Sequence, residues 1–417
     1  MKKKLLSVLL LVSVAASGML LSACEQKKPN QSDASSKVSA VSTPQISRVT
    51  PASSEPMEVS MDEKKPRMTE AQLTDLNKKV TAAQAIPSFT STSEKLDCWE
   101  IGKTLTVSLI SENSSASFQS ELERNFKRTA DRLGVKTVTS AETDSSVSSL
   151  NDALAQAVQD KNGMIMLSGD IMKDTIAGSI ELAQANGIKV VSAGTAGTHQ
   201  PDRYVDYTVP IPYENAGALM ADWGIVKTKG KVHALVVTCS ESGLSQTIFH
   251  GFKQEFEQYV SADDGSCTVV NATAIELGNG LANKIKTMLE NDRKINYIFV
   301  CDDTAIKDAI SAVVQTGTDT KIVATGGTQE DMDYAQSGSI DMLVAHSYEW
   351  TAYAMLDYAM RLSGGLTLPT EQDVPFRVLT KDVIKKAIDE YKDSFDTFHE
   401  ICFGDAFVTG YNNLWNY

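Results

Sequence analysis

The sequence predicts an α/β fold in which parallel sheets are covered by helices, and this pattern occurs in two rounds. From about residue 103 onward, apolar runs typical of buried strands alternate with amphipathic segments of helical period. Several amphipathic segments end at a glycine, such as Gly134 and Gly187, as helices often do. The chain has 417 residues, 42% hydrophobic and 22% charged, which is enough for two lobes of ordinary size and a tail.

The first round alternates strictly between strands and helices. Its expected strands are residues 105–110, 135–138, 164–167 and 188–192. Its expected helices are residues 118–133, 150–160 and 175–186. Because each helix follows a strand and precedes the next, the run predicts parallel strands joined by helical crossovers.

The second round repeats the pattern with one more strand. Its expected strands are residues 232–238, 268–275, 295–300, 321–324 and 342–345. Its expected helices are residues 246–259, 281–290, 304–315 and 329–338. The two rounds predict two sheets, each covered by its own helices.

The first 23 residues have the pattern of an export signal. Three lysines at positions 2–4 precede an apolar stretch over 5–14 that is too short for a full membrane-spanning helix. The following LSAC at 21–24 resembles the lipobox of bacterial lipoproteins. That resemblance implies cleavage before Cys24, lipid on its sulfur, and an extracytoplasmic protein held at the cell membrane. The alternative is an ordinary signal peptide in which Cys24 is incidental.

Residues 24–100 are interpreted as the lipidated cysteine followed by a flexible tether. Up to about residue 66 the chain is rich in Ser, Lys, Gln, Pro and Thr and has few apolar residues to bury. Residues 68–86 have the pattern of a helix, with Thr69 and Gln72 at capping-box spacing. The pattern fits both a helix docked on the globular part and a loose one, and a helix in a tether is more often a spacer than a functional site.

Charge and motifs exclude several classes of protein. The formal net charge of -14 argues against a nucleic-acid partner. No GxSxG elbow, HExxH, P-loop or paired Cys-x-x-Cys occurs, so we expect no enzyme, no cofactor and no metal site. Five cysteines remain after Cys24, an odd number in an exported chain, which leaves at least one thiol unpaired or paired between molecules.

Several segments together resemble the type I periplasmic binding proteins of the ribose- and galactose-binding kind. They are, in order, residues 106–134 (TVSLISENSSASFQSELERNFKRTADRLG), 149–167, 181–193, 250–256 (HGFKQEF), 297–310 (YIFVCDDTAIKDAI) and 321–365. The ordered set, over about residues 104–370, carries the resemblance rather than any one motif.

The resemblance implies two Rossmann-like, doubly wound lobes with parallel sheets, joined by three hinge crossings. The crossings would lie at 209–213, at 346–348 and within 366–377. Pro210 and Pro212 suit the first of them, because proline favours an extended link over a helix. The N-terminal lobe would then comprise 101–210 and 347–370, and the C-terminal lobe and tail 211–346 and 371–417.

Ligand is expected in the crevice beyond the carboxyl ends of the parallel strands. Family positions add Phe118 as an aromatic that stacks on a sugar ring, and Gln246 where ribose binders place an arginine. The predicted ligand-binding residues are Glu112, Asn113, Phe118, Ser168, Asp170, Thr195, Glu241, Gln246, Asp302, Thr325 and His346. The structural alternatives are a core role for Phe118, helix capping for the aspartates and a hinge hydrogen bond for His346.

The residues at these strand ends depart from those of sugar binders and are acidic. Gly194, Thr195 and Gly326 stand where hexose and pentose binders often carry Asp or Arg. No Lys or Arg occurs among the strand-end residues, so an anionic ligand is disfavoured. We expect a sugar-like, nucleoside or amine-bearing ligand.

The implied function is that of a monomeric solute-binding protein that delivers this ligand to an ABC permease. One alternative is a ligand-sensing co-receptor for a membrane kinase or chemoreceptor. Another is an enzyme anchored at the membrane, because a fold does not determine a function.

Overall fold

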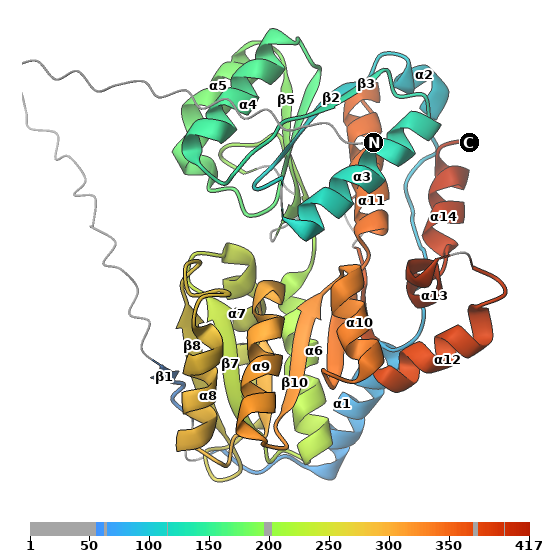
Figure 1. The fold of residues 1–417 in the computed structure, drawn as a ribbon. Coiled ribbons are helices and arrows are strands. Elements are labelled where there is room, and N and C mark those ends of the chain that lie inside the picture. The colour runs from blue at the N-terminus through green and yellow to red at the C-terminus, as the bar shows by residue number, and fades with distance from the viewer. Residues whose placement is uncertain (1–55, 62–64, 115, 196–201, 370–373, 396) are drawn as a thin grey trace, which may run out of the picture. The chain divides into compact units, whose positions relative to one another are not determined.

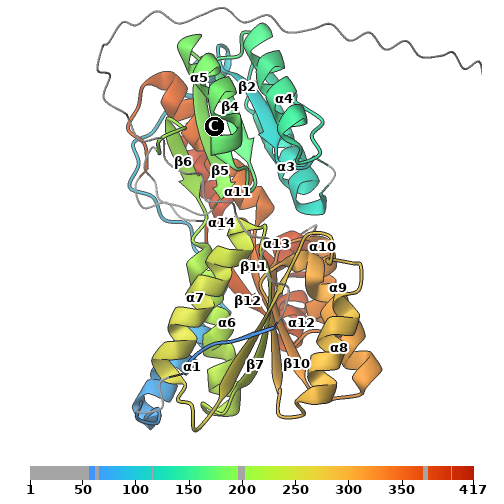
Figure 2. The same cartoon turned by 90° about the vertical axis from the view of Figure 1, so that its left-hand side faces the viewer.

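The computed structural model describes residues 56–61, 65–114, 116–195, 202–369, 374–395 and 397–417. They belong to one compact unit and form two sheets, each with helices on both of its faces (Figures 1 and 2). The predicted α/β architecture is therefore confirmed. The signal sequence and the lipobox cysteine lie outside the described residues.

The first sheet has five parallel strands in the order β3-β2-β4-β5-β6. Its strands are β2 (Thr106–Ser111), β3 (Thr137–Ser140), β4 (Met164–Ser168), β5 (Lys189–Thr195) and β6 (Tyr207–Pro210). Its helices are α3 (Ser117–Arg132), α4 (Val147–Gln159), α5 (Ala177–Ala185) and α11 (Tyr348–Gly364), with the 3-10 turn η1 (Lys173–Ile176) before α5. Alternate strand residues face opposite sides, so Leu109 packs in the core with α3 and α11, whereas Ile110 packs with α4 and α5.

The second sheet has seven strands in the order β1-β8-β7-β9-β10-β11-β12, with antiparallel strands at both edges. Its strands are β1 (Met57–Glu58), β7 (His233–Cys239), β8 (Ser266–Ala272), β9 (Tyr297–Val300), β10 (Lys321–Gly326), β11 (Met342–His346) and β12 (Phe376–Leu379). Its helices are α6 (Tyr213–Thr228), α7 (Gly243–Tyr259), α8 (Leu281–Asn291), α9 (Ile306–Thr316) and α10 (Gln329–Ser337), with the 3-10 turn η2 (Asp303–Ala305) before α9. Val236 faces the core that holds α6 and α7, and Val237 the core that holds α8, α9 and α10.

The chain passes between the sheets at the three expected places. It leaves the first sheet after β6 to form α6, returns from β11 to α11, and enters the second sheet again at β12. The lobes of the two sheets are therefore connected by three crossings, as the resemblance implied.

Part of the segment interpreted as a tether is instead folded onto the protein, which corrects that prediction. Strand β1 pairs antiparallel with β8, and Val59 beside it is buried. Helix α1 (Glu70–Ala82) has the expected capping box of Thr69 and Gln72, and it buries Leu76 and Val80 against the globular part. The edge of β8 offers free backbone groups, and pairing with them fixes a segment whose own composition is polar.

The C-terminal tail does not belong wholly to the C-terminal lobe, which corrects a second prediction. Helix α12 (Lys381–Tyr391) and helix α13 (Phe398–Phe403) contribute to the core of the second sheet. Helix α14 (Ala406–Leu414), in contrast, lies on α11 of the first lobe, where Phe407 stacks on Trp350 with ring centroids 4.8 Å apart. The tail is thus a further connection between the lobes.

The segment between α1 and α2 (Cys98–Gly102) runs beside this tail. The backbone N–H of Leu96 donates to Leu414 at 2.8 Å, and that of Cys98 donates to Trp415 at 3.2 Å. Figure 1 shows the blue N-terminal segment and the red C-terminal segment passing together from one lobe to the other. Two outer segments therefore accompany the three central crossings.

Helix α1 is attached to the second lobe through an ion pair with two acids, one of them buried. The Nζ atom of Lys79 lies 2.7 Å from Asp222 of α6 and 2.9 Å from Glu255 of α7. The Asp222 side chain is fully buried. Burial raises the pKa of Asp222 to about 7, and Glu255 adds to the rise against the opposing effect of Lys79.

We expect Asp222→Asn to stabilise the protein increasingly between pH 5 and pH 8. The folded state holds a proton on Asp222 that the unfolded chain releases near pH 4, so wild-type stability falls as pH rises towards 7, with a slope of at most about 1.4 kcal/mol per pH unit. Asparagine cannot ionise and removes this slope. Urea unfolding at several pH values measures it, with the exposed Asp75→Asn of α1 as control. A difference between variant and wild type that is independent of pH would contradict this expectation.

Candidate functional site

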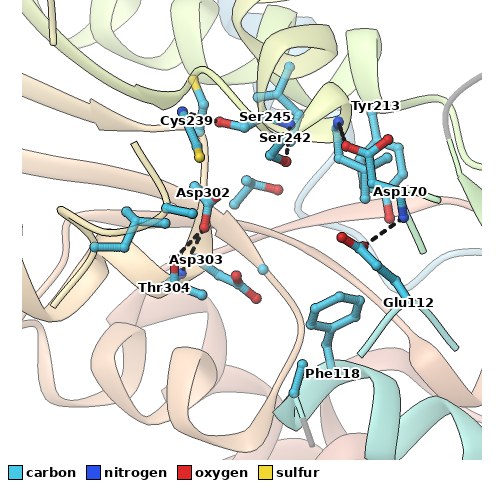
Figure 3. Close-up of a pocket in the computed structure, with 18 of the residues that line it drawn as sticks. Glu112, Phe118, Asp170, Tyr213, Cys239, Ser242, Ser245, Asp302, Asp303 and Thr304 are labelled. Atoms are coloured by element: carbon cyan, nitrogen blue, oxygen red, sulfur yellow. Dashed lines mark hydrogen bonds between the residues drawn. The ribbon is translucent and has the colours of Figure 1, made fainter. Parts of the chain in front are cut away.

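A cavity of about 320 Å³ lies where the carboxyl ends of the two parallel sheets meet. Glu112 and Asp170 follow strands β2 and β4 of the first lobe, and Glu241 and Asp302 follow β7 and β9 of the second. Figure 3 shows side chains from both lobes around this space. Its place agrees with the rule that open parallel sheets bind ligand beyond the carboxyl ends of their strands.

Most of the ligand-binding residues expected from the sequence line this cavity. They are Glu112, Asn113, Phe118, Asp170, Glu241, Asp302, Thr325 and His346. The structure brings them together from six separate chain segments, so they are retained as candidate ligand contacts.

Three other expected residues do not line the cavity. The buried hydroxyl of Ser168 donates to Gln119 at 2.9 Å. The amide of Gln246 donates to the Cys239 carbonyl at 2.8 Å and to Thr238 at 3.1 Å, so it fixes the end of β7. Thr195 ends β5 at a shift in the strand register beside β6. These three residues are therefore not retained as candidate ligand contacts.

The structure adds two hinge tyrosines and a third aspartate that were not among the predicted contacts. Tyr213 opens α6 directly after the first crossing, and Tyr348 opens α11 directly after the second. Asp303 adjoins Asp302. Their positions in the sequence could have indicated these residues, because all three lie within or beside the segments expected at the hinges and strand ends.

Several of the cavity carboxylates accept hydrogen bonds from backbone N–H groups. Asp170 accepts from Gly243 and from Leu244, at 3.2 Å for the latter, and so joins the first lobe to the start of α7 in the second. Asp302 accepts from Thr304 at 3.3 Å and caps η2. The contact between Asp170 and α7 therefore places the N-terminus of a second-lobe helix against a carboxylate of the first lobe.

Two further carboxylates are held in the same way. Glu241 accepts from the N–H of Ala274 at 3.1 Å, and one oxygen of Glu112 accepts from the N–H of Asp170 at 2.9 Å. Burial raises the pKa of Glu112, and the negative charges of Asp170 and Asp302 also raise it. The hydrogen bond from the Asp170 backbone opposes this rise.

The ionised form of Asp303 is stabilised little by the groups around it. Burial raises its pKa well above the ordinary value, and the charges of Asp331 and Asp302 add to the rise. The groups that lower it are two backbone N–H groups, its own and that of Thr304, and no cation is among them.

Aromatic rings form the wall beside these acids. His346 meets Tyr348 edge to face at 4.6 Å between ring centroids, and Tyr348 lies 6.4 Å from Phe118. Burial lowers the pKa of His346 to about 4 against a hydrogen bond with the Gly326 backbone, so the ring is neutral at neutral pH. Its Nδ1 atom is buried and has no hydrogen-bond partner among the described residues.

The cysteines of the described residues are buried thiols. Cys239 and Cys301 both line the cavity, and neither is in a disulfide. Burial raises the pKa of both thiols, so neither is activated as a nucleophile. Among the described residues no cluster of His, Cys, Asp and Glu could hold a metal ion.

The sequence of residues 107–367 matches the periplasmic binding protein domain family. The chain belongs to this family. The match covers more than half of the chain and agrees with the resemblance of the ordered segments. In the periplasmic binding protein family the expected location is extracytoplasmic, and no helix in the described part of this chain is long and apolar enough to cross a membrane.

Solved structures of similar fold are solute-binding proteins. GanP, a glucose-galactose binding protein of Geobacillus stearothermophilus, is 18% identical with a TM-score of 0.58, and the match covers 67% of this chain and 98% of GanP. An ABC transporter solute binding protein of Agrobacterium vitis, bound with α-D-tagatopyranose, is 15% identical with a TM-score of 0.58, over 67% of this chain and 96% of that one.

A third similar structure is the solute binding protein of Burkholderia graminis in complex with D-arabinose. It is 16% identical with a TM-score of 0.58, over 71% of this chain and 99% of that one. At these identities the three structures show that this periplasmic binding protein shares their fold. No curated protein has a significantly similar sequence.

Proposed function

We propose that this protein is a lipid-anchored solute-binding protein that captures a small polar ligand between its lobes and delivers it to an ABC permease. The observation that carries the proposal is the cavity of about 320 Å³ lined by both lobes. Its acids and aromatic rings suit a ligand with several hydrogen-bond donors and a ring or apolar portion. The sugar-binding descriptions of the structural neighbours support the same class of function.

Capture of a solute can be tested with a metabolite extract. Purified protein is incubated with the extract and washed by ultrafiltration, and released molecules are identified by mass spectrometry. The matched variant is Ala116→Trp, because Ala116 lines the cavity and a large ring there fills it. We expect at least one solute to be retained by the wild type and lost in the variant. Equal retention by both would refute capture in this cavity.

We expect Cys24→Ser to release the protein from the membrane or to leave it misprocessed. A serine hydroxyl cannot take the thioether-linked lipid, and each buried methylene of such a lipid contributes about 0.8 kcal/mol to membrane binding. Membrane fractionation and mass analysis of the N-terminus measure both effects. A variant that stays in the membrane with the wild-type N-terminus would show that Cys24 is not the anchor.

A further inference from the structure

The charged residues of the cavity are all acids. They are Glu112, Asp170, Glu241, Asp302 and Asp303, and no described residue that lines the cavity is Lys or Arg. Lys307 lines an adjoining hollow with Asp303, but its Nζ atom pairs with Glu330 at 2.9 Å. Four of these acids are half-buried and Glu241 is exposed. Carboxylates partly withdrawn from water are stabilised by a countercharge, so the ligand itself is the natural source of positive charge.

These acids form two groups according to their hydrogen-bond partners. Asp170, Asp302 and Glu241 accept from backbone N–H groups at the starts of helices and turns, which explains their presence without a ligand. Only one oxygen of Glu112 accepts such a hydrogen bond. The negative charge of Asp303 is stabilised by N–H groups of its own turn and by no cation. Figure 3 shows Glu112 and Asp303 directed into the same space from opposite lobes, with the ring of Phe118 beside them.

A second observation is independent of the acids. His346 is 4% exposed, lines the cavity, and has no hydrogen-bond partner at Nδ1. That nitrogen is itself enclosed, so the neutral ring forms an uncharged part of the wall and supplies no countercharge to the acids. Tyr213 and Tyr348, whose phenol pKa values are raised by burial and by the charge of Asp303, complete this side of the cavity.

We propose that the ligand is a small organic ammonium whose nitrogen binds between Asp303 and Glu112 and whose apolar or ring portion lies on Phe118. An ammonium group has a positive charge and only donors, so it matches two carboxylates at once. The aromatic wall adds cation–π attraction. A neutral polyol leaves the negative charge of the cavity uncompensated, and an anion is repelled by it. This inference rests on the proposed function and narrows its ligand class.

Matched pairs of compounds test the charge requirement directly. The probes are D-glucosamine with D-glucose, putrescine with 1,4-butanediol, and phenethylamine with phenethyl alcohol. Each is titrated into the full protein by calorimetry and thermal shift. We expect one or more amines to bind about tenfold tighter than their hydroxyl partners, because a charge-assisted hydrogen bond is roughly twice as strong as a neutral one.

Two variants test whether the preference for amines depends on the Asp303 carboxylate. Asp303→Asn should weaken the amine at least tenfold and leave the hydroxyl partner nearly unchanged. The control Asp319→Asn makes the same charge change on an exposed loop of the same lobe, outside the cavity. It should leave the affinities for the amine and for its hydroxyl partner unchanged.

The possible outcomes separate the two proposals. Tighter amine binding that depends on Asp303 supports an ammonium ligand. Equal or tighter binding of the neutral partners, or binding of no amine, overturns it. In both of those cases solute capture itself is judged by the extract assay, where retention of a neutral solute upholds the proposed function without the ammonium ligand.

Discussion

Gly217→Ala should destabilise the protein by about 3 kcal/mol or more, because helices α6 and α7 approach each other too closely for a side chain there. A Cβ atom on Gly217 would lie 1.9 Å from the Ile248 carbonyl oxygen. On the facing helix, a Cβ on Gly251 would lie 2.1 Å from the Glu214 carbonyl oxygen. Both obstacles are backbone atoms, so no rotamer change relieves the overlap.

The control for this variant is Gly178→Ala in helix α5, where a Cβ meets nothing within 4 Å. That change should stabilise the protein by about 0.5–1 kcal/mol, since alanine has the higher helix propensity. Denaturant unfolding of both variants gives the comparison. Similar free energies of unfolding for the two variants would show that the close contact of α6 and α7 is not present in solution.

Arg361→Met should destabilise the protein by about 3–5 kcal/mol, the expected effect of removing one partner of a buried ion pair. Arg361 and Asp357 are both fully buried in α11, with 2.8 Å between Nε and the carboxylate. Asp357 also accepts from Trp415 Nε1 at 2.8 Å, which ties the C-terminal residues to the first lobe. Loss of the arginine leaves a buried anion beside that indole.

The double variant Arg361→Met with Asp357→Asn should recover a large part of this loss. Asparagine removes the buried charge while its amide oxygen still accepts from Trp415. Unfolding free energies of the single and double variants provide the measurement. If the double variant is less stable than Arg361→Met alone, the uncompensated charge is not the cause of the loss.

The central alternation of strands and helices was predictable because hydrophobic periodicity reports directly on burial. The predicted strand over 268–275 was nevertheless too long, since β8 ends at Ala272. There the Glu276 side chain accepts from the N–H of Thr273 at 2.8 Å and starts a turn, and Ile275 is exposed. A local side-chain hydrogen bond ended an apolar run that periodicity alone would extend.

Strand β1 and the position of helix α14 were not predictable from local pattern. Strand β1 has two residues, and its pairing is decided by the open edge of β8 rather than by its own sequence. The position of α14 likewise depends on an aromatic surface of α11 that the sequence of the tail does not reveal. Such features follow from tertiary contacts between segments far apart in the chain.

The candidate site was predictable in location and only partly in residues. Strand ends gave Glu112, Asp170 and Asp302, because the carboxyl edge of a parallel sheet is where such residues gather. The exclusion of Gln246 depends on partners at Thr238 and Cys239 that only the folded β7 supplies. The direction of a hinge side chain such as Tyr348 depends on the path of the crossing, which periodicity does not describe.

A crystal structure of the protein with the solute retained in the extract assay would show whether the ligand is captured between the lobes. We expect one molecule in the cavity, in contact with Phe118 of the first lobe and with Asp303 of the second. A solute bound to one lobe only, or outside the cavity, would contradict capture between the lobes.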